Sequence, residues 1–229
     1  LCDISGKAVK TIAWLHGRQG KAMARAMTQP EAKPWINAIH AYTPGKAKSD
    51  DGRVLIKLSA NENPLGCSEQ ATAALVEARS TLARYPDPAS NALREALGKA
   101  YGLEADQIVC GTGSDELLNL IAMGYAGAGD EIIYVRYGFS VYDIAARKCA
   151  ATVVVAPDKD YGTGVDALLA LVNDKTRVVF IANPNNPTGT LWDAAVIERL
   201  IAAQGAAGGL VVMDEAYQPF AARSWIENV

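Results

Sequence analysis

From about residue 67 onward, short apolar runs alternate with longer stretches in which apolar residues recur at helical spacing. Side chains repeat every second residue along a strand and about every 3.6 residues around a helix, so the short runs predict strands and the longer stretches predict helices. Strands separated by helices are typical of an α/β fold with a mainly parallel sheet flanked by helices. The expected strands cover residues 107–110, 131–135, 152–156, 177–182 and 210–213, and the expected helices cover residues 69–84, 90–101, 114–126, 140–149, 165–172 and 194–204.

Composition excludes several classes of protein. The 229 residues are 50% apolar with a net charge of −3, whereas a nucleic-acid-binding surface needs a basic excess. The sequence shows no apolar run of membrane-spanning length and no signal-peptide pattern, so we expect neither a membrane partner nor export. Two histidines and four scattered cysteines argue against a metal site and a disulfide framework, and they favour a reducing cytoplasm.

The first 26 residues differ from the rest of the chain. They show no clear periodicity, and Met27 follows them and opens a segment punctuated by Pro and Gly. We interpret residues 1–26 as a leader that is non-native, translated from upstream sequence, or disordered. The alternative is a natural, flexible leader.

The segments that follow the expected strands are the candidate binding sites, because ligands in open α/β sheets bind beyond the carboxyl ends of strands. Residues 111–116 (GTGSDE) lead from a strand into a helix. Glycines there let the backbone approach an anion, and the free N–H groups and the helix dipole favour a phosphate. The segment matches neither the dinucleotide pattern nor the Walker A loop. The alternative is a plain helix start capped by Ser114 or Asp115.

Two further segments place polar side chains after strands. Residues 183–190 (NPNNPTGT) form a loop stiffened by proline, which can hold Asn186 in position to donate to a ligand oxygen. Residues 214–217 (DEAY) place Asp214 at the end of a buried strand, where a carboxylate needs a partner such as a ring-nitrogen cation. Tyr217 can donate to a neighbouring oxygen. The alternatives are a simple turn for the first segment, and a helix cap with a surface tyrosine for the second.

In order and spacing, these three segments resemble the fold-type I aminotransferases. The chain is similar to the class-II aminotransferase family, and within it to the histidinol-phosphate aminotransferases, from about Pro34 to the C-terminus. One departure is Tyr137-Gly138, where the family usually has Pro-Thr or Pro-Ser before an aromatic residue. The matching motifs are residues 59–64 (SANENP), 84–86 (RYP), 113–116 (GSDE), 137–140 (YGFS), 183–189 (NPNNPTG) and 214–217 (DEAY).

The resemblance implies a domain organisation and an assembly. Residues 67–229 are expected to form a large domain that binds pyridoxal 5'-phosphate, with one antiparallel strand in its sheet. Residues 27–66 are expected to form an N-terminal arm and part of a small domain. The C-terminal small domain of the family is expected to be absent from the 229 residues, which leaves the large domain incomplete. The protein is expected to be a homodimer.

The resemblance also implies roles for the residues that match the family's cofactor and substrate positions. Asp214 and Tyr217 are the expected catalytic side chains. The full set comprises Gly113, Ser114 and Asp115 at the cofactor phosphate, Phe139 stacked on the pyridine ring, Asn186 and Tyr217 at the ring hydroxyl oxygen, Asp214 at the pyridinium nitrogen, Tyr85 reaching the partner subunit's cofactor, and Asn61 and Asn63 near the substrate.

The implied reaction exchanges an amino group between L-histidinol phosphate and 2-oxoglutarate in histidine biosynthesis. Residues 215–229 contain no Lys, so the Schiff-base lysine is missing, and we expect a truncated chain that is inactive alone. Another class-II aminotransferase acting on aromatic amino acids and a threonine-phosphate decarboxylase are alternatives. A non-catalytic phosphate-binding module is an alternative of a different class, in which Asp214, Asn186 and Tyr217 would not converge.

Overall fold

A computed structural model of the chain describes residues 31–40, 46–58, 60–158, 160–162 and 164–228. The predicted leader over residues 1–26 lies outside these residues, as does Ser59 of the SANENP motif. Residues 33–229 form one compact unit. The predicted boundary at residues 66–67 therefore stays a prediction.

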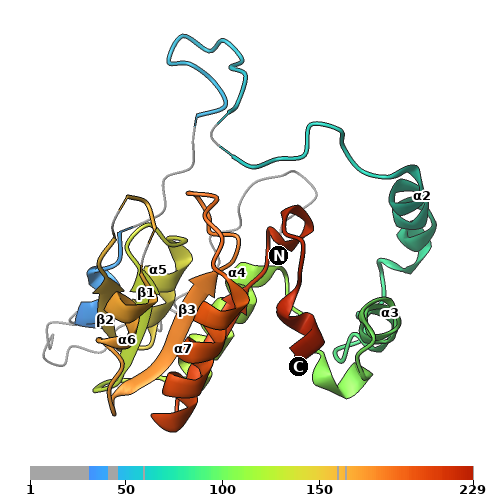
Figure 1. The fold of residues 1–229 in the computed structure, drawn as a ribbon. Helices are drawn as coiled ribbons and strands as arrows, with labels where there is room; N and C mark the ends of the chain where they lie inside the picture. Colours follow the sequence, from blue (N-terminus) through green and yellow to red (C-terminus); the bar gives the residue numbers. More distant parts are fainter. Residues whose placement is uncertain (1–30, 41–45, 59, 159, 163, 229) are drawn as a thin grey trace, which may run out of the picture. The chain divides into compact units, whose positions relative to one another are not determined.

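The centre of this unit is a four-stranded parallel sheet in the order β2-β1-β3-β4 (Figure 1). In the register, Val135 pairs with Ala156, and Ala182 at the end of β3 pairs with Asp214 at the end of β4. All pairings of the described strands are parallel, so the expected antiparallel strand is not among the described residues. The strands are β1 (Glu131–Val135), β2 (Thr152–Ala156), β3 (Thr176–Ala182) and β4 (Leu210–Asp214).

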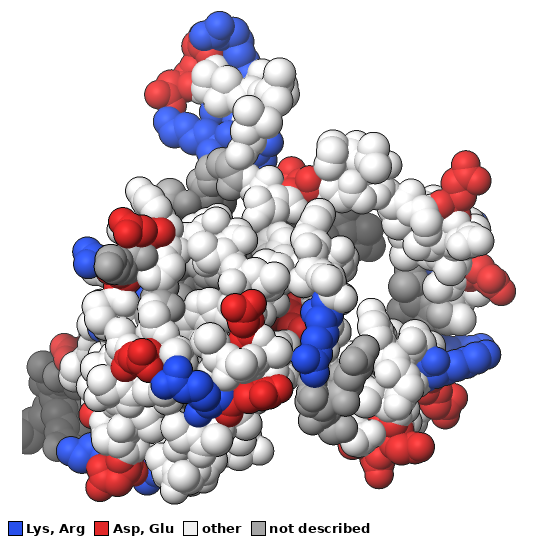
Figure 2. All heavy atoms as spheres, viewed as in Figure 1, with Lys and Arg blue, Asp and Glu red and all other residues white. Residues whose placement is uncertain are grey.

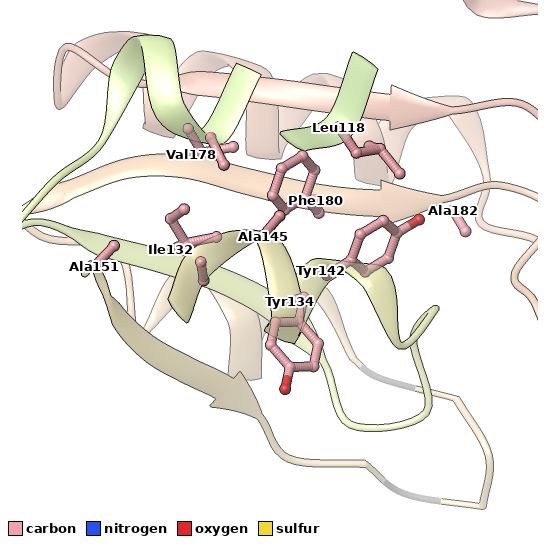
Figure 3. Close-up of a cluster of buried hydrophobic side chains, with 11 residues drawn as sticks. Leu118, Ile132, Tyr134, Tyr142, Ala145, Ala151, Val178, Phe180 and Ala182 are labelled. Atoms are coloured by element: carbon pink, nitrogen blue, oxygen red, sulfur yellow. The ribbon is translucent and has the colours of Figure 1, made fainter. Parts of the chain in front are cut away.

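Helices cover both faces of the sheet, and alternate residues of each central strand point to opposite faces. Ile132 and Tyr134 of β1 join a cluster with α4 and α5, whereas Ile133 and Val135 join a second cluster with α6 and α7. Figure 3 shows the first cluster, around Tyr142 and Phe180. The helices on the sheet are α4 (Ser114–Tyr125), α5 (Val141–Lys148), α6 (Val165–Leu169) and α7 (Ala194–Ala206).

The part of the chain before the sheet buries little. Ser68 caps α2 by accepting a hydrogen bond from the Ala71 backbone N–H at 3.1 Å, and Gly102 ends α3 in the left-handed conformation, as predicted for that glycine. No side chain of α2 is buried. The elements are α1 (Pro34–Asn37), α2 (Glu69–Ala78) and α3 (Asn91–Tyr101), and the 3-10 turns of the unit are Arg79–Thr81, Ala105–Gln107, Gln218–Phe220 and Trp225–Asn228.

One predicted strand is wrong. Residues 105–107 form a 3-10 turn, and residues 108–110 continue as unpaired chain. A strand needs a neighbour to accept and donate its backbone hydrogen bonds, and none of the described strands runs beside this segment. Val109 is accordingly 72% exposed. The predicted helix over residues 69–84 is also too long: α2 ends at Ala78, and a 3-10 turn over Arg79–Thr81 follows it.

Candidate active site

The ends of β3 and β4, the start of α4 and the segment after β1 surround one cavity of about 670 Å³. This volume lies within the range of roughly 300–1,000 Å³ that is typical of ligand pockets. The cavity lies at the carboxyl edge of the parallel sheet, where the sequence places its candidate sites. Its lining includes Asn61, Ser114, Phe139, Asn186, Asp214 and Tyr217.

The loop before α4 presents backbone donors to this cavity. Gly113 is the N-cap and has a φ of 118°, a conformation that glycine adopts without a steric penalty. Helix α4 begins at Ser114, so neither Ser114 nor Asp115 caps it, and that alternative interpretation is wrong. The first N–H groups of the helix have no carbonyl within the helix to donate to, and they remain available for an anion.

The Glu116 side chain folds back onto the loop before α4 and bonds Thr112. Its Oε2 accepts hydrogen bonds from the Thr112 backbone N–H at 2.6 Å and from the Thr112 hydroxyl at 3.0 Å. The bond from the Thr112 backbone, and to a smaller extent the bond from its hydroxyl, lower the pKa of the Glu116 carboxyl below its usual value. The Glu116 carboxylate therefore stabilises the loop before α4. It does not accept a hydrogen bond from the N–H groups of the first helical turn.

The loop at residues 183–190 is fixed by its asparagines. The Asn185 side chain donates to the Tyr137 carbonyl at 3.0 Å and to the Thr188 hydroxyl at 2.7 Å, which joins this loop to the segment that carries Phe139. The Asn183 backbone N–H donates to the Asp214 carbonyl at 3.0 Å. The Asn186 side chain, which lines the cavity, makes no hydrogen bond within the described part of the chain. Its amide remains available to a ligand.

Asp214 is held by two donors. The Tyr142 hydroxyl donates to Oδ2 at 2.8 Å, and the Ala216 backbone N–H donates to Oδ1 at 3.1 Å. Burial, the Asp214 charge and this hydrogen bond raise the pKa of the Tyr142 hydroxyl above its usual value. Tyr142 therefore stays a neutral donor, and the half-buried carboxylate of Asp214 is oriented into the cavity.

Gly138 is required by the packing under Phe139. A Cβ atom at this position would lie 2.9 Å from the Val135 carbonyl oxygen and 3.3 Å from the Tyr142 ring. The Phe139 ring meets Tyr142 edge-on, with centroids 6.0 Å apart at 88°. The glycine at position 138, where the family usually has Thr or Ser, therefore allows this turn to lie close to Tyr142 of α5.

The arm before α2 contributes Asn61, whose side-chain amide donates to the Tyr217 hydroxyl at 2.5 Å. Asn63 lies in an adjoining cavity of about 850 Å³, which Tyr217 also lines. The Asn63 amide donates to the Gly66 carbonyl at 3.1 Å, within its own turn. The structure thus brings Asn61 into contact with Tyr217, whereas Asn63 lines only the adjoining cavity.

The remaining predicted site residues lie apart from this cavity. Tyr85 is fully exposed. Asp115 lines a different cavity of about 300 Å³, together with Phe139 and Lys148 at the end of α5. The roles proposed for these residues stay predictions.

Two residues with a clear place in the site were not singled out from the sequence. From the sequence, no role is assigned to Tyr142, which lies in the predicted helix over residues 140–149, or to Asn185, which lies in the predicted loop over residues 183–190. The spacing of Tyr142, three residues after Phe139, puts it on the helix face that packs against Phe139 and Phe180. That spacing predicts the ring contact with Phe139 but carries no signal for the hydrogen bond to Asp214.

No helix among the described residues is long and apolar enough to cross a membrane. Within the same residues, no group of three or more His, Cys, Asp and Glu side chains is arranged to hold a metal ion. On the face shown in Figure 2, acidic and basic side chains are interspersed.

Comparison with known proteins agrees with this geometry. The family model for aminotransferase class I and II matches residues 53–228. The histidinol-phosphate aminotransferase of Erythrobacter litoralis (strain HTCC2594) is 58% identical over 193 residues, which are 84% of this chain and 52% of the relative. That of Sphingopyxis alaskensis is 56% identical over 191 residues, 82% of this chain and 51% of the relative. The chain spans about half the length of the curated relatives it matches.

Solved structures give the same fold. The crystal structure of histidinol-phosphate aminotransferase from Sinorhizobium meliloti in complex with pyridoxal-5'-phosphate has a TM-score of 0.72 and 28% identity, covering 86% of this chain and 52% of that one. The family match covers most of this chain, and the motifs after the strands lie inside it. The chain belongs to the class I and II aminotransferase family.

Proposed function

We propose that this chain contributes the cofactor-binding part of an aminotransferase that exchanges an amino group between L-histidinol phosphate and 2-oxoglutarate. The observation that carries the proposal is that Asp214, Asn186 and Tyr217 line one cavity with Phe139. Such convergence disfavours a phosphate-binding module, which would not need these three side chains together. The names of the similar relatives support the choice of histidinol phosphate.

The residues of the cavity fit pyridoxal 5'-phosphate, which family membership and the pyridoxal-phosphate-bound neighbour imply as the cofactor. Each Asp214 oxygen has one described donor, and a carboxylate accepts about four hydrogen bonds, so Asp214 retains capacity for a protonated ring nitrogen. Asn186, which lines the same cavity, has an unused amide. The N–H groups at the start of α4 suit a phosphate.

The bound cofactor would supply an electron sink for the negative charge that develops at the substrate Cα. Asp214 would hold a proton on the ring nitrogen, because an opposite charge close by favours the cationic form. Phe139 would hold the ring by stacking. The remaining residues assigned to the cofactor and substrate are Asn186 and Tyr217 at the ring hydroxyl oxygen, Gly113, Ser114 and Asp115 at the phosphate, Tyr85 of the partner subunit at the same phosphate, and Asn61 and Asn63 beside the substrate.

Two further parts of the proposal concern the whole protein. Residues 215–229 contain no Lys, and an aminotransferase needs a lysine to hold the cofactor and carry a proton. We therefore expect residues 1–229 by themselves not to transaminate. We also expect a homodimer in the cytoplasm, consistent with the free thiols of Cys67, Cys110 and Cys149.

The test is to express the protein with any coding sequence that follows Val229 and to titrate it with pyridoxal 5'-phosphate. Amino transfer to 2-oxoglutarate is then measured from histidinol phosphate and from aromatic amino acids. Cofactor absorbance together with fastest turnover of histidinol phosphate is the expected result. Faster turnover of an aromatic donor would change the proposed substrate to an aromatic amino acid. Absence of cofactor binding would refute the enzyme proposal.

Replacing Asp214 sharpens this test. Asp214→Asn keeps the shape of the side chain and removes its charge, so amino transfer should fall by about 100-fold or more, as for the loss of a charge that stabilises the transition state. Asp158→Asn, a carboxyl outside the cavity, is the control and should leave turnover unchanged. Equal turnover of the wild type and Asp214→Asn would show that Asp214 has no role in the reaction.

A further inference from the structure

The Tyr142 side chain links the core of the sheet to the candidate active site. It comes from α5, is fully buried, and its hydroxyl reaches Asp214 Oδ2 at 2.8 Å. Figure 3 shows this hydroxyl directed toward Ala182, the residue of β3 that pairs with Asp214. The contact therefore joins an element on one face of the sheet to the carboxylate at the sheet edge.

Neighbouring rings hold Tyr142 in place. Its ring stacks on Phe180 with centroids 5.0 Å apart and planes at 8°, and it meets Phe139 edge-on at 6.0 Å. Buried rings in contact with several others have few rotamers open to them. The hydroxyl is thus delivered to Asp214 by a rigid arrangement.

No other described side chain donates to Asp214. The second donor, the Ala216 backbone N–H, bonds the other oxygen. Without the Tyr142 hydroxyl, Oδ2 would lose its only described partner inside a half-buried site. The carboxylate would then be free to turn about its last torsion, since one donor fixes only one oxygen.

We propose that Tyr142 is a positioning residue, which fixes the Asp214 carboxylate in the orientation that receives the cofactor ring nitrogen. Its ring also supports Phe139 through their edge-on contact. This inference rests on the proposed function, since it assigns Asp214 to that nitrogen. Tyr142 does not itself line the cavity. It acts through Asp214 and Phe139.

The molecule offers a matched control. Tyr134 lies in the same aromatic cluster, 6.2 Å from the Tyr142 ring, and its hydroxyl also donates to a carboxylate. That carboxylate belongs to Asp143, which pairs with Arg147 at 2.7 Å. Tyr134→Phe and Tyr142→Phe therefore each remove one tyrosine hydroxyl from the same cluster, but only Tyr142→Phe removes a donor to Asp214.

The experiment compares these variants in the protein expressed with any coding sequence after Val229. Affinity for pyridoxal 5'-phosphate is measured by absorbance titration, and the bound spectrum is followed against pH. Tyr142→Phe should bind the cofactor about tenfold more weakly, the equivalent of one hydrogen bond to a charged group. Its bound spectrum should change at a lower pH than in the wild type, because a loosely held carboxylate stabilises the ring-nitrogen cation less. Tyr134→Phe should match the wild type in both measurements.

A second measurement needs no cofactor. In the cofactor-free protein, thermal unfolding of Tyr142→Phe, Asp214→Asn and the double variant forms a double-mutant cycle. Melting-temperature shifts that fail to add are expected for partners in contact, whereas additive shifts would overturn the link.

The outcomes separate the two proposals. If the wild type binds no cofactor, the proposed function fails and this inference fails with it. If the wild type binds while Tyr142→Phe and Tyr134→Phe behave alike in affinity and pH profile, the proposed function stands and only the positioning role is wrong.

Discussion

In α7, Leu200 is fully buried against the sheet, whereas in α2 Leu75 is 72% exposed. Both leucines lie in the interior of amphipathic helices that the same sequence pattern predicts. The difference is that α7 packs on β3 and β4 within an apolar cluster, whereas no residue of α2 is buried. An apolar helix face therefore contributes to stability only where another element covers it, and the site depends on the covered part of the molecule.

The largest effect is expected from Leu200→Ala. Removing a fully buried leucine side chain leaves a cavity in the α6–α7 cluster and should lower the free energy of unfolding by about 2–5 kcal/mol. Denaturant unfolding followed by circular dichroism measures this loss. A loss below about 1 kcal/mol would mean that α7 is not packed as described.

A smaller loss is expected from Gly138→Ala. The new Cβ would press on the Val135 carbonyl and the Tyr142 ring, and such overpacking costs about 1–3 kcal/mol of unfolding free energy. Cofactor affinity should fall as well, because Tyr142 and Phe139 would shift.

Gly124→Ala is the matched control for this change. Gly124 lies in α4 with open space around it, so alanine should raise the free energy of unfolding by about 0.5–1 kcal/mol through helix propensity. If the free energy of unfolding changed in the same direction in Gly138→Ala and Gly124→Ala, the crowding described at Gly138 would be contradicted.

A pH effect is expected at Tyr134. Burial, the Asp143 charge and the hydrogen bond to Asp143 raise the pKa of Tyr134 to about 12, from about 10 in the unfolded chain. The folded state then keeps a proton that the unfolded state loses. The stability is therefore fully present below pH 10 and is lost as the pH rises from about 10 to about 12. Urea unfolding across this range should show a shallower decline in Tyr134→Phe than in the wild type, and equal slopes would contradict the raised pKa.

The smallest effect is expected from Leu75→Ala, the same substitution as Leu200→Ala in the exposed helix. Its free energy of unfolding should change by less than about 0.5 kcal/mol, measured by the same denaturant titration. A loss as large as that of Leu200→Ala would show that another surface covers α2 in the protein.

The sequence by itself determined the elements of the sheet region. Strand β1 over residues 131–135 and β2 over residues 152–156 were predicted to the residue, because apolar runs between turn signals depend on local pattern. The same pattern predicted a strand at residues 107–110, which is unpaired, since a strand exists only where a neighbour bonds it. The motifs after β3 and β4 also placed Asn186, Asp214 and Tyr217 at one edge of the sheet, because parallel strands share that edge.

Only the tertiary structure decided how these residues are held. Tyr142 lies 72 positions from Asp214 in the chain, and nothing local to either residue indicates that the hydroxyl of one meets the carboxylate of the other. Asn185 bonds the Tyr137 carbonyl across 48 positions in the same way. Hydrogen bonds of this kind depend on how helices pack on the sheet, and packing is set by the summed contacts of the whole core.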